Sequence, residues 1–171
     1  MDEFLQQLLI AAEAGMYYLA ILGALTVPDI CAGLESEDGL TNGERYRSWF
    51  DQWVAPKYAV GPERTPSFTG EDAWRFRCSM LHHGTTQHPA SRYVRVLFVP
   101  SGPNGNVFHN NVLNDALNLD IPTFCNDVVQ SALSWRSVVD ASGTYRRNLD
   151  KFVRVHPTGV PPYIVGSPVI S

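Results

Sequence analysis

The chain has 171 residues, a length that suits one domain with its own core and no need of disulfides or a metal for stability. Hydrophobic residues make up 44% of the chain and charged residues 18%, a composition that excludes disorder on a large scale. The formal net charge of −4 argues against a protein that coats nucleic acid by bulk electrostatics, although it is compatible with a small basic cleft.

The three cysteines, Cys31, Cys78 and Cys125, are far apart and form no CxxC pair, a pattern typical of thiols in a reducing compartment. The first residues are acidic where a secretory signal would be basic, so we expect a cytoplasmic protein. The apolar stretch 14–28 is shorter than the roughly 18 to 20 residues that a membrane span needs. It therefore predicts a buried core helix and no membrane partner.

Apolar residues recur at spacings of three and four over residues 2–26 and predict one long first helix. The second half of this helix is apolar nearly all round, which is typical of a helix at the centre of a bundle or in a subunit interface. Pro28 is expected to end the helix and to begin a short second one over 28–36. A third helix is expected at 44–58, with Thr41 and the glutamate three residues later as its capping box.

A fourth helix is predicted over residues 70–83 by the signals at its two ends. Thr69 and Asp72 form a capping-box pattern at its start. Gly84 follows its last residue, where a glycine commonly ends a helix in the left-handed conformation.

The segment "RYVRVLFVP" at 92–100 is the clearest strand, and the turn "SGPNGN" allows residues 107–109 to pair back on it as a hairpin. The remaining elements are expected in chain order as a fifth helix at 119–142 begun by Asp120 and Pro122, a short sixth helix at about 142–153, and an extended proline-rich tail at 156–171. Together these features predict a mainly α fold, a bundle of five to six helices with one small β-hairpin at about 92–110, in a single domain over 1–155.

The stretch "EDAWRFRCSMLHHGTTQH", residues 71–88, gathers arginines and histidines at the end of the fourth helix. Adjacent histidines point about 100° apart on a helix, and the chain has no HExxH or CxxC spacing, so the pattern does not favour a metal site. The chain also has no GxSxG elbow, and its "GPNG" lacks the lysine and hydroxyl residue of a phosphate-binding loop. We therefore expect neither a metal nor another cofactor.

Within this stretch, "RCSMLHHG" places His82 five residues after Arg77, at the helix end. The segment resembles the R-x(4–6)-H motif of HEPN (higher eukaryotes and prokaryotes nucleotide-binding) domains, all-α bundles that often dimerise and in many members are metal-independent ribonucleases. The resemblance implies that His82 is the acid/base, because imidazole titrates near neutral pH, and that Arg77 holds the phosphate. It also implies a homodimer with two copies of the motif at one cleft, for which the N-terminal helix offers an interface.

The choice of arginine stays open, because Arg75 also fits the spacing of the motif, although we prefer Arg77. Cys78 departs from the family, whose active members usually carry a polar residue, often asparagine, right after the arginine. The residues that could support the pair lie on the same helix and are Arg75, Ser79, His83, Glu71 and Asp72. The segment and its flanks, "YYLAILGALTVPDICAGLES" and "LNLDIPTFCNDVVQSALSW", are also similar to a group of bacterial proteins of unknown function.

Two functions are compatible with these features. The resemblance implies an HEPN-like endoribonuclease or RNA-binding protein of a toxin–antitoxin or defence system, with RNA as substrate and an antitoxin-like protein as a further partner. The alternative is a non-catalytic dimeric interaction module, in which the histidines and arginines serve the fold. Cations are favoured at a helix C-terminus by the helix dipole and by the last carbonyl groups, so such a cluster needs no chemistry to explain it.

Overall fold

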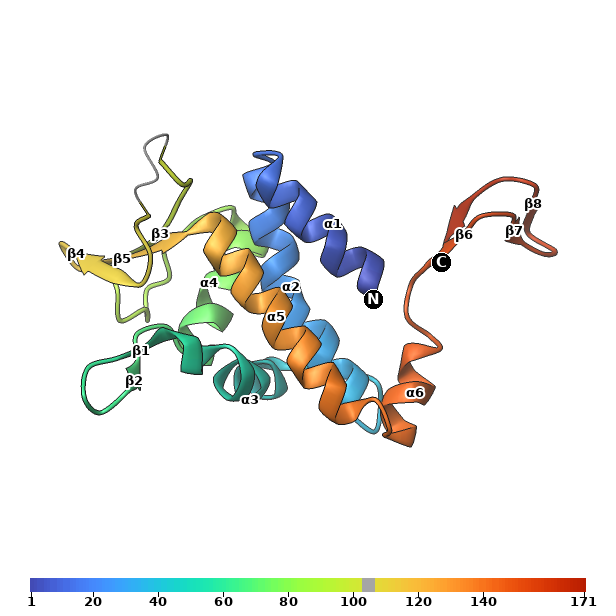
Figure 1. The fold of residues 1–171 in the computed structure, drawn as a ribbon, viewed down its shortest axis with the longest axis horizontal. Helices are drawn as coiled ribbons and strands as arrows, with labels where there is room; N and C mark the ends of the chain where they lie inside the picture. Colours follow the sequence, from blue (N-terminus) through green and yellow to red (C-terminus); the bar gives the residue numbers. More distant parts are fainter. Residues whose placement is uncertain (103–106) are drawn as a thin grey trace.

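The computed structural model describes residues 1–102 and 107–171 (Figure 1). Over these residues the fold is mainly α, as the sequence predicts, with several short strands. The helices are α1 (Asp2–Glu13), α2 (Tyr17–Glu35), α3 (Gly43–Trp53), the 3-10 helix η1 (Ala55–Tyr58), α4 (Gly70–His83), α5 (Ile121–Val139) and α6 (Gly143–Leu149). The strands are β1 (Ala59–Val60), β2 (Thr65–Pro66), β3 (Arg95–Val99), β4 (Asn111–Leu113), β5 (Ala116–Asp120), β6 (Val155–His156), β7 (Gly159–Val160), β8 (Ile164–Val165) and β9 (Val169–Ile170).

Helix α2 lies at the centre of the bundle, where it packs against α1, α3, α4, α5 and α6 (Figure 1). Ala20, Ala24 and Leu25 on this helix are fully buried. A helix that is covered by neighbours on several sides has to be apolar nearly all round. This position confirms the interpretation of the apolar stretch as a core helix.

The expected first helix over 2–26 is wrong in its extent, because the chain bends between α1 and α2. Gly15 at the bend has a φ of 75°, a left-handed conformation that glycine adopts without a Cβ clash. The expected break at Pro28 is also wrong, since α2 continues through this buried proline to Glu35. Packing of α2 on many sides outweighs the hydrogen bond that the proline cannot donate.

The continuous α2 changes one further expectation. By length and composition this helix is long and apolar enough to cross a membrane, which the shorter stretch 14–28 was not. More than half of this apolar window of α2 is buried within the bundle, as in the core helix of a folded domain.

Helix α3 begins one residue earlier than expected, and its cap differs. The side chain of Asn42, not Thr41, accepts a hydrogen bond from the Arg45 amide at 2.9 Å, so the expected capping box with Glu44 does not form. Asparagine at this position has an extended backbone and an oxygen within reach of the first turn, which makes it an effective cap. The regular helix then ends at Trp53 and gives way to η1.

Helix α4 confirms the predicted bounds of 70–83. The hydroxyl of Thr69 accepts from the amide of Asp72, and the carboxylate of Asp72 accepts from the amide of Thr69, so the capping box forms in both directions. Gly84 ends the helix with a φ of 65°. Gly70 holds the start of α4 tightly against α3, because a Cβ on it would lie 2.3 Å from the Arg47 carbonyl oxygen.

The expected hairpin at 92–110 is wrong. Strand β3 pairs in parallel with β5, and β4 pairs with the other edge of β5 in antiparallel fashion, giving the order β3-β5-β4. The hairpin turn lies instead at Asn114 and Asp115, both of which have positive φ angles, as a type I′ turn requires. Residues 107–109 form no strand, and part of the expected "SGPNGN" turn lies outside the described residues.

Helix α5 starts at the expected cap, since the Asp120 carboxylate accepts from the Thr123 amide at 2.9 Å. Helix α6 is shorter than expected and ends at Leu149.

The tail is not simply extended, because β6 pairs with β9 and β7 with β8 to form a narrow hairpin. Figure 1 shows this hairpin projecting away from the helices.

Candidate functional site

Helix α4 carries both residues of the predicted motif near its C-terminal end. The last carbonyl groups of α4 are capped by the backbone, because the Gly84 amide donates to the Met80 carbonyl and the Thr85 amide donates to the Ser79 carbonyl. This arrangement closes the helix end without a histidine side chain. His82 makes no hydrogen bond with the residues that the structure describes, and it is exposed to solvent.

Arg77 points from α4 towards α2. Its Nε and one of its terminal nitrogens each lie 3.0 Å from Oδ2 of Asp29, and the two side chains are 20% and 13% exposed, respectively. The guanidinium carbon also lies 5.1 Å from the centre of the Trp74 ring, within the range of a cation–π interaction. Arg77 is therefore fixed in position by an acid from α2 and an aromatic ring from its own helix.

Asp29 reaches Arg77 because α2 continues through Pro28 and keeps the next residue on a helical face towards α4. Burial raises the pKa of the Asp29 carboxyl, and the Arg77 guanidinium offsets part of that effect. The second carboxyl oxygen of Asp29 is buried without a hydrogen-bond partner in the described residues, as is the Tyr46 hydroxyl. Burial raises the pKa of Tyr46 well above its ordinary value, and the charge of Asp29 adds to this.

The structure does not bring Arg77 and His82 into contact within one chain. Positions five apart lie about 140° apart around a regular helix, and α4 stays regular through both residues. Arg77 is turned inwards to Asp29, whereas His82 is exposed beside His83, with the two rings 6.4 Å apart. A chemical step that uses both groups therefore needs a substrate that spans them or a second chain.

The predicted supporting residues are placed by the fold in different ways. Arg75 forms an ion pair with Glu71 at 2.8 Å and bonds the Ala90 carbonyl. Glu71 also pairs with Arg47 of α3 at 3.3 Å. These contacts link the outer side of α4 to its neighbours, so Arg75 is less available to a ligand than its spacing from His82 implies.

Asp72 and Ser79 are both buried, so neither can contact a substrate at the surface. Asp72 is held in the capping box with Thr69, and its Oδ2 lies 2.9 Å from a guanidinium nitrogen of Arg92. Of the supporting residues, His83 is the one that lies exposed next to His82.

A separate polar cluster around His109 joins η1, α5 and the segment before β4. His109 Nε2 lies 3.7 Å from Oδ2 of Asp127, whose other oxygen is 3.6 Å from Lys57 Nζ. The His109 ring packs against Tyr58, with ring centres 5.3 Å apart. Burial lowers the pKa of His109, against the opposing effect of Asp127. The cluster lies against η1 and α5, so His109 is not part of the helix end that carries His82.

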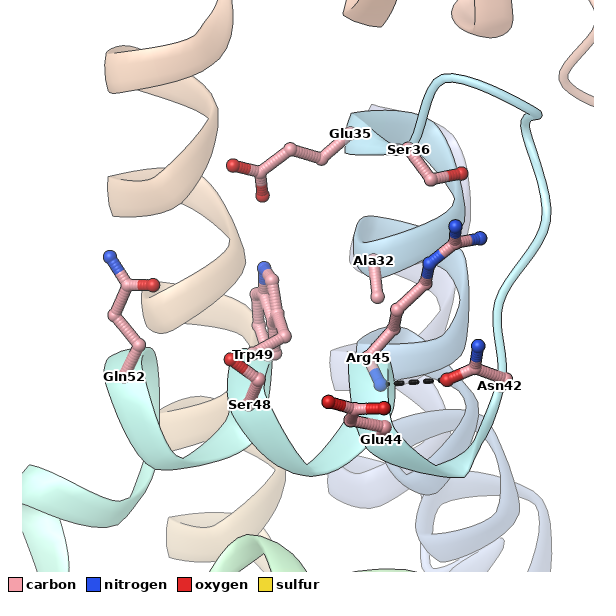
Figure 2. A pocket seen from close by; sticks show the side chains of 9 residues that line it. All are labelled: Ala32, Glu35, Ser36, Asn42, Glu44, Arg45, Ser48, Trp49 and Gln52. Atoms are coloured by element: carbon pink, nitrogen blue, oxygen red, sulfur yellow. Dashed lines mark hydrogen bonds between the residues drawn. The ribbon is translucent and has the colours of Figure 1, made fainter.

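A pocket of about 490 Å³ lies between the end of α2 and one side of α3 (Figure 2). The Glu35 carboxylate extends over it and accepts a hydrogen bond from the Trp135 indole at 2.9 Å. The indole nitrogen of Trp49 at its base is buried and has no partner in the described residues. Arg45 on the rim is paired with Asp38 at 2.7 Å, so it contributes little charge to a ligand.

Comparisons with protein-family models, with curated proteins and with solved structures each found no match to this chain. Within the described residues, the structure brings together no group of three or more His, Cys, Asp or Glu side chains that could hold a metal ion. The resemblance of "RCSMLHHG" to the HEPN motif therefore rests on this sequence segment alone.

Proposed function

We propose that this protein is an HEPN-like, metal-independent endoribonuclease that acts as a homodimer, with His82 as the acid/base and Arg77 as the phosphate-binding cation. The observation that carries this proposal is that the C-terminal end of α4 is capped without a histidine side chain. Backbone amides cap α4, so the exposed His82 imidazole is not needed to close the helix. Imidazole is a side chain that can both accept and donate a proton, as a general acid/base has to, and its exposure leaves it accessible to a substrate.

The chemistry follows from these two groups. His82 accepts the proton of a ribose 2′-hydroxyl, and the oxygen attacks the adjacent phosphorus. The bond from phosphorus to the 5′-oxygen then breaks, the leaving oxygen takes up a proton from water, and the His82 imidazolium releases its proton to solvent. The products are a 2′,3′-cyclic phosphate and a 5′-hydroxyl, and no metal takes part.

Arg77 supports the charge that develops on the phosphate. Two of the five N–H donors of its guanidinium are directed at Asp29, and the other three have no partner in the described residues. Asp29 and Trp74 hold the group in place before RNA binds, which reduces the ordering that the transition state requires. Because Arg77 and His82 diverge on one helix, a homodimer through the N-terminal helices would complete the cleft with two copies of the motif.

The substrate class we propose is RNA, either single-stranded RNA or transfer RNA. The biological setting would be a toxin–antitoxin or defence system, with an antitoxin-like protein as partner. The test is incubation of the purified protein with such RNA in the presence of EDTA. We expect cleavage that leaves 2′,3′-cyclic phosphate ends and that is lost in His82→Gln. His83→Gln is the matched control, since it removes the neighbouring exposed imidazole and should retain activity.

Arg77→Lys and Arg75→Lys form a second matched pair. Lysine keeps the charge but not the planar fork of donors, so the first change should lower the rate and the second should have little effect. Equal activity of wild type and His82→Gln, or cleavage that EDTA abolishes, would overturn the proposal.

The contacts of Arg77 favour one alternative, a non-catalytic dimeric interaction module. A guanidinium that is largely buried, paired with Asp29 and stacked on Trp74 is also what a structural ion pair between two helices looks like. In that case every variant and the wild type leave RNA intact. Removal of Arg77 then lowers the melting temperature as its main effect.

A further inference from the structure

The C-terminal arm, residues 154–171, is a hairpin that is held together by its own backbone. The amide of Arg154 donates to the carbonyl of Ser171 at 2.9 Å, and the amide of Ser171 donates back at 3.1 Å. The strand pairs Val155–Ile170 and Val160–Ile164 continue the hairpin towards its tip. The chain thus builds a defined projection rather than a loose tail (Figure 1).

The arm exposes much apolar surface. None of its residues is buried, and Tyr163, Val165 and Ile170 are 84%, 72% and 73% exposed. A two-stranded hairpin alone is marginally stable in water, and an exposed apolar strand pair invites association with another surface. An arm of this composition therefore requires a surface that covers it.

The same chain offers such a surface at the bend between α1 and α2. A groove of about 330 Å³ lies there and is lined mainly by apolar side chains, including Phe4, Leu8 and Met16. Ile10 and Leu19 along it are 49% and 63% exposed. The groove is open and apolar, like the arm.

The helix α1 that forms one side of the groove is acidic, whereas the arm and its base are basic. Helix α1 carries Asp2, Glu3 and Glu13 and no lysine or arginine. Asp2 is already paired with Arg136 of α5, whereas no ion pair of the described residues engages the two glutamates. The arm and its base carry Lys151 and Arg154, and residues 151–171 include no aspartate or glutamate.

We propose that the C-terminal arm of one chain docks into the α1–α2 groove of a second copy, and that the two copies exchange arms reciprocally. A twofold exchange uses each arm and each groove once and closes, so it covers both apolar surfaces without leading to a fibre. This inference adds the contacting segments to the homodimer that the proposed function contains. It does not depend on ribonuclease activity, and the two can fail separately.

The test is the oligomeric state of the full chain at micromolar concentration, by sedimentation or light scattering. We expect a dimer for the wild type and a Kd raised by roughly 100-fold in either of two charge-reversal variants, Lys151→Glu with Arg154→Glu or Glu3→Lys with Glu13→Lys. An equimolar mixture of the two variants should restore the dimer, because each arm then meets an α1 helix of opposite charge. Arms that fold back on their own chain would not be rescued by mixing.

The apolar contact is tested separately with Tyr163→Asp, which should also dissociate the dimer. Val138→Asp is its matched control, since Val138 is 68% exposed on α5, outside both surfaces, and its replacement should leave the dimer intact. A monomeric wild type, a dimer that survives Tyr163→Asp, or a mixture of charge variants that stays monomeric would each overturn the proposal. Circular dichroism of each variant confirms that the helices are retained.

Discussion

Replacement of Asp29 by asparagine removes the charge that faces Arg77 and keeps the shape of the side chain. Loss of one partner from a fully buried ion pair costs about 3–5 kcal/mol, whereas an exposed pair contributes about 0–1 kcal/mol. The Asp29 and Arg77 side chains are 13% and 20% exposed, which lies between these limits but nearer the buried one. We therefore expect Asp29→Asn to lower the free energy of unfolding by about 2–3 kcal/mol.

The assay is urea unfolding followed by circular dichroism, with thermal melting as a second measure. In a domain of this size, 1 kcal/mol corresponds to about 2–4 °C, so the melting temperature should fall by about 5–10 °C. A double-mutant cycle with Arg77→Met isolates the pair, and its coupling free energy should be at least about 1 kcal/mol. An Asp29→Asn protein within about 0.5 kcal/mol of the wild type, or additive single changes, would refute the role of this ion pair in placing Arg77.

Three further predictions follow from the fold. Gly70→Ala should destabilise the protein by about 1–3 kcal/mol, because its Cβ would lie 2.3 Å from a backbone carbonyl of α3. Gly143→Ala should not, because a Cβ at that position has no neighbour within 4 Å. Thermal melting compares the two variants. Asn42→Ala should cost about 1 kcal/mol as a lost helix cap, and Thr41→Ala less than about 0.5 kcal/mol, in urea unfolding. Burial lowers the pKa of His109 from 6.5, so the histidine takes up a proton in the unfolded chain before it does in the folded one as the pH falls. The free energy of unfolding should therefore decrease below pH 6.5. Urea titrations at several pH values should show a smaller decrease in His109→Gln.

Helix α4 was predictable from sequence because its signals are local. Thr69 and Asp72 at its start and Gly84 at its end lie within one turn of the boundaries they set, and no distant contact overrides them. Pro28 is the opposite case. Its local preference is to end a helix, but packing of α2 on many sides determines the outcome, and that packing cannot be seen in a short window.

The small sheet was mispredicted for a related reason. The strand partner of β3 is β5, about twenty residues further on, and the strand that lies between them in sequence occupies the far edge. The sequence did contain one local signal for the true hairpin, the polar pair Asn114 and Asp115, which adopts the positive φ angles of a tight turn. Parallel pairing itself has no such short-range signal.

In the candidate site, too, the local features were predictable from the sequence and the long-range contacts were not. The motif placed Arg77 and His82 on one helix and His82 at its end, as the structure has them. It gave no indication of Asp29, which is 48 residues from Arg77 in the chain and becomes its partner through the packing of α2 on α4. The backbone cap at the helix end was indicated by Gly84, and it leaves the histidines available for another role.

The catalytic role of His82 is tested by the rate of RNA cleavage in EDTA by the wild type and by His82→Gln under identical conditions. A positioned general acid/base contributes about 10²–10⁴-fold, so we expect the variant to be slower by at least about 100-fold while its melting temperature is unchanged. Equal rates, or no cleavage by either protein, would contradict a catalytic role for His82.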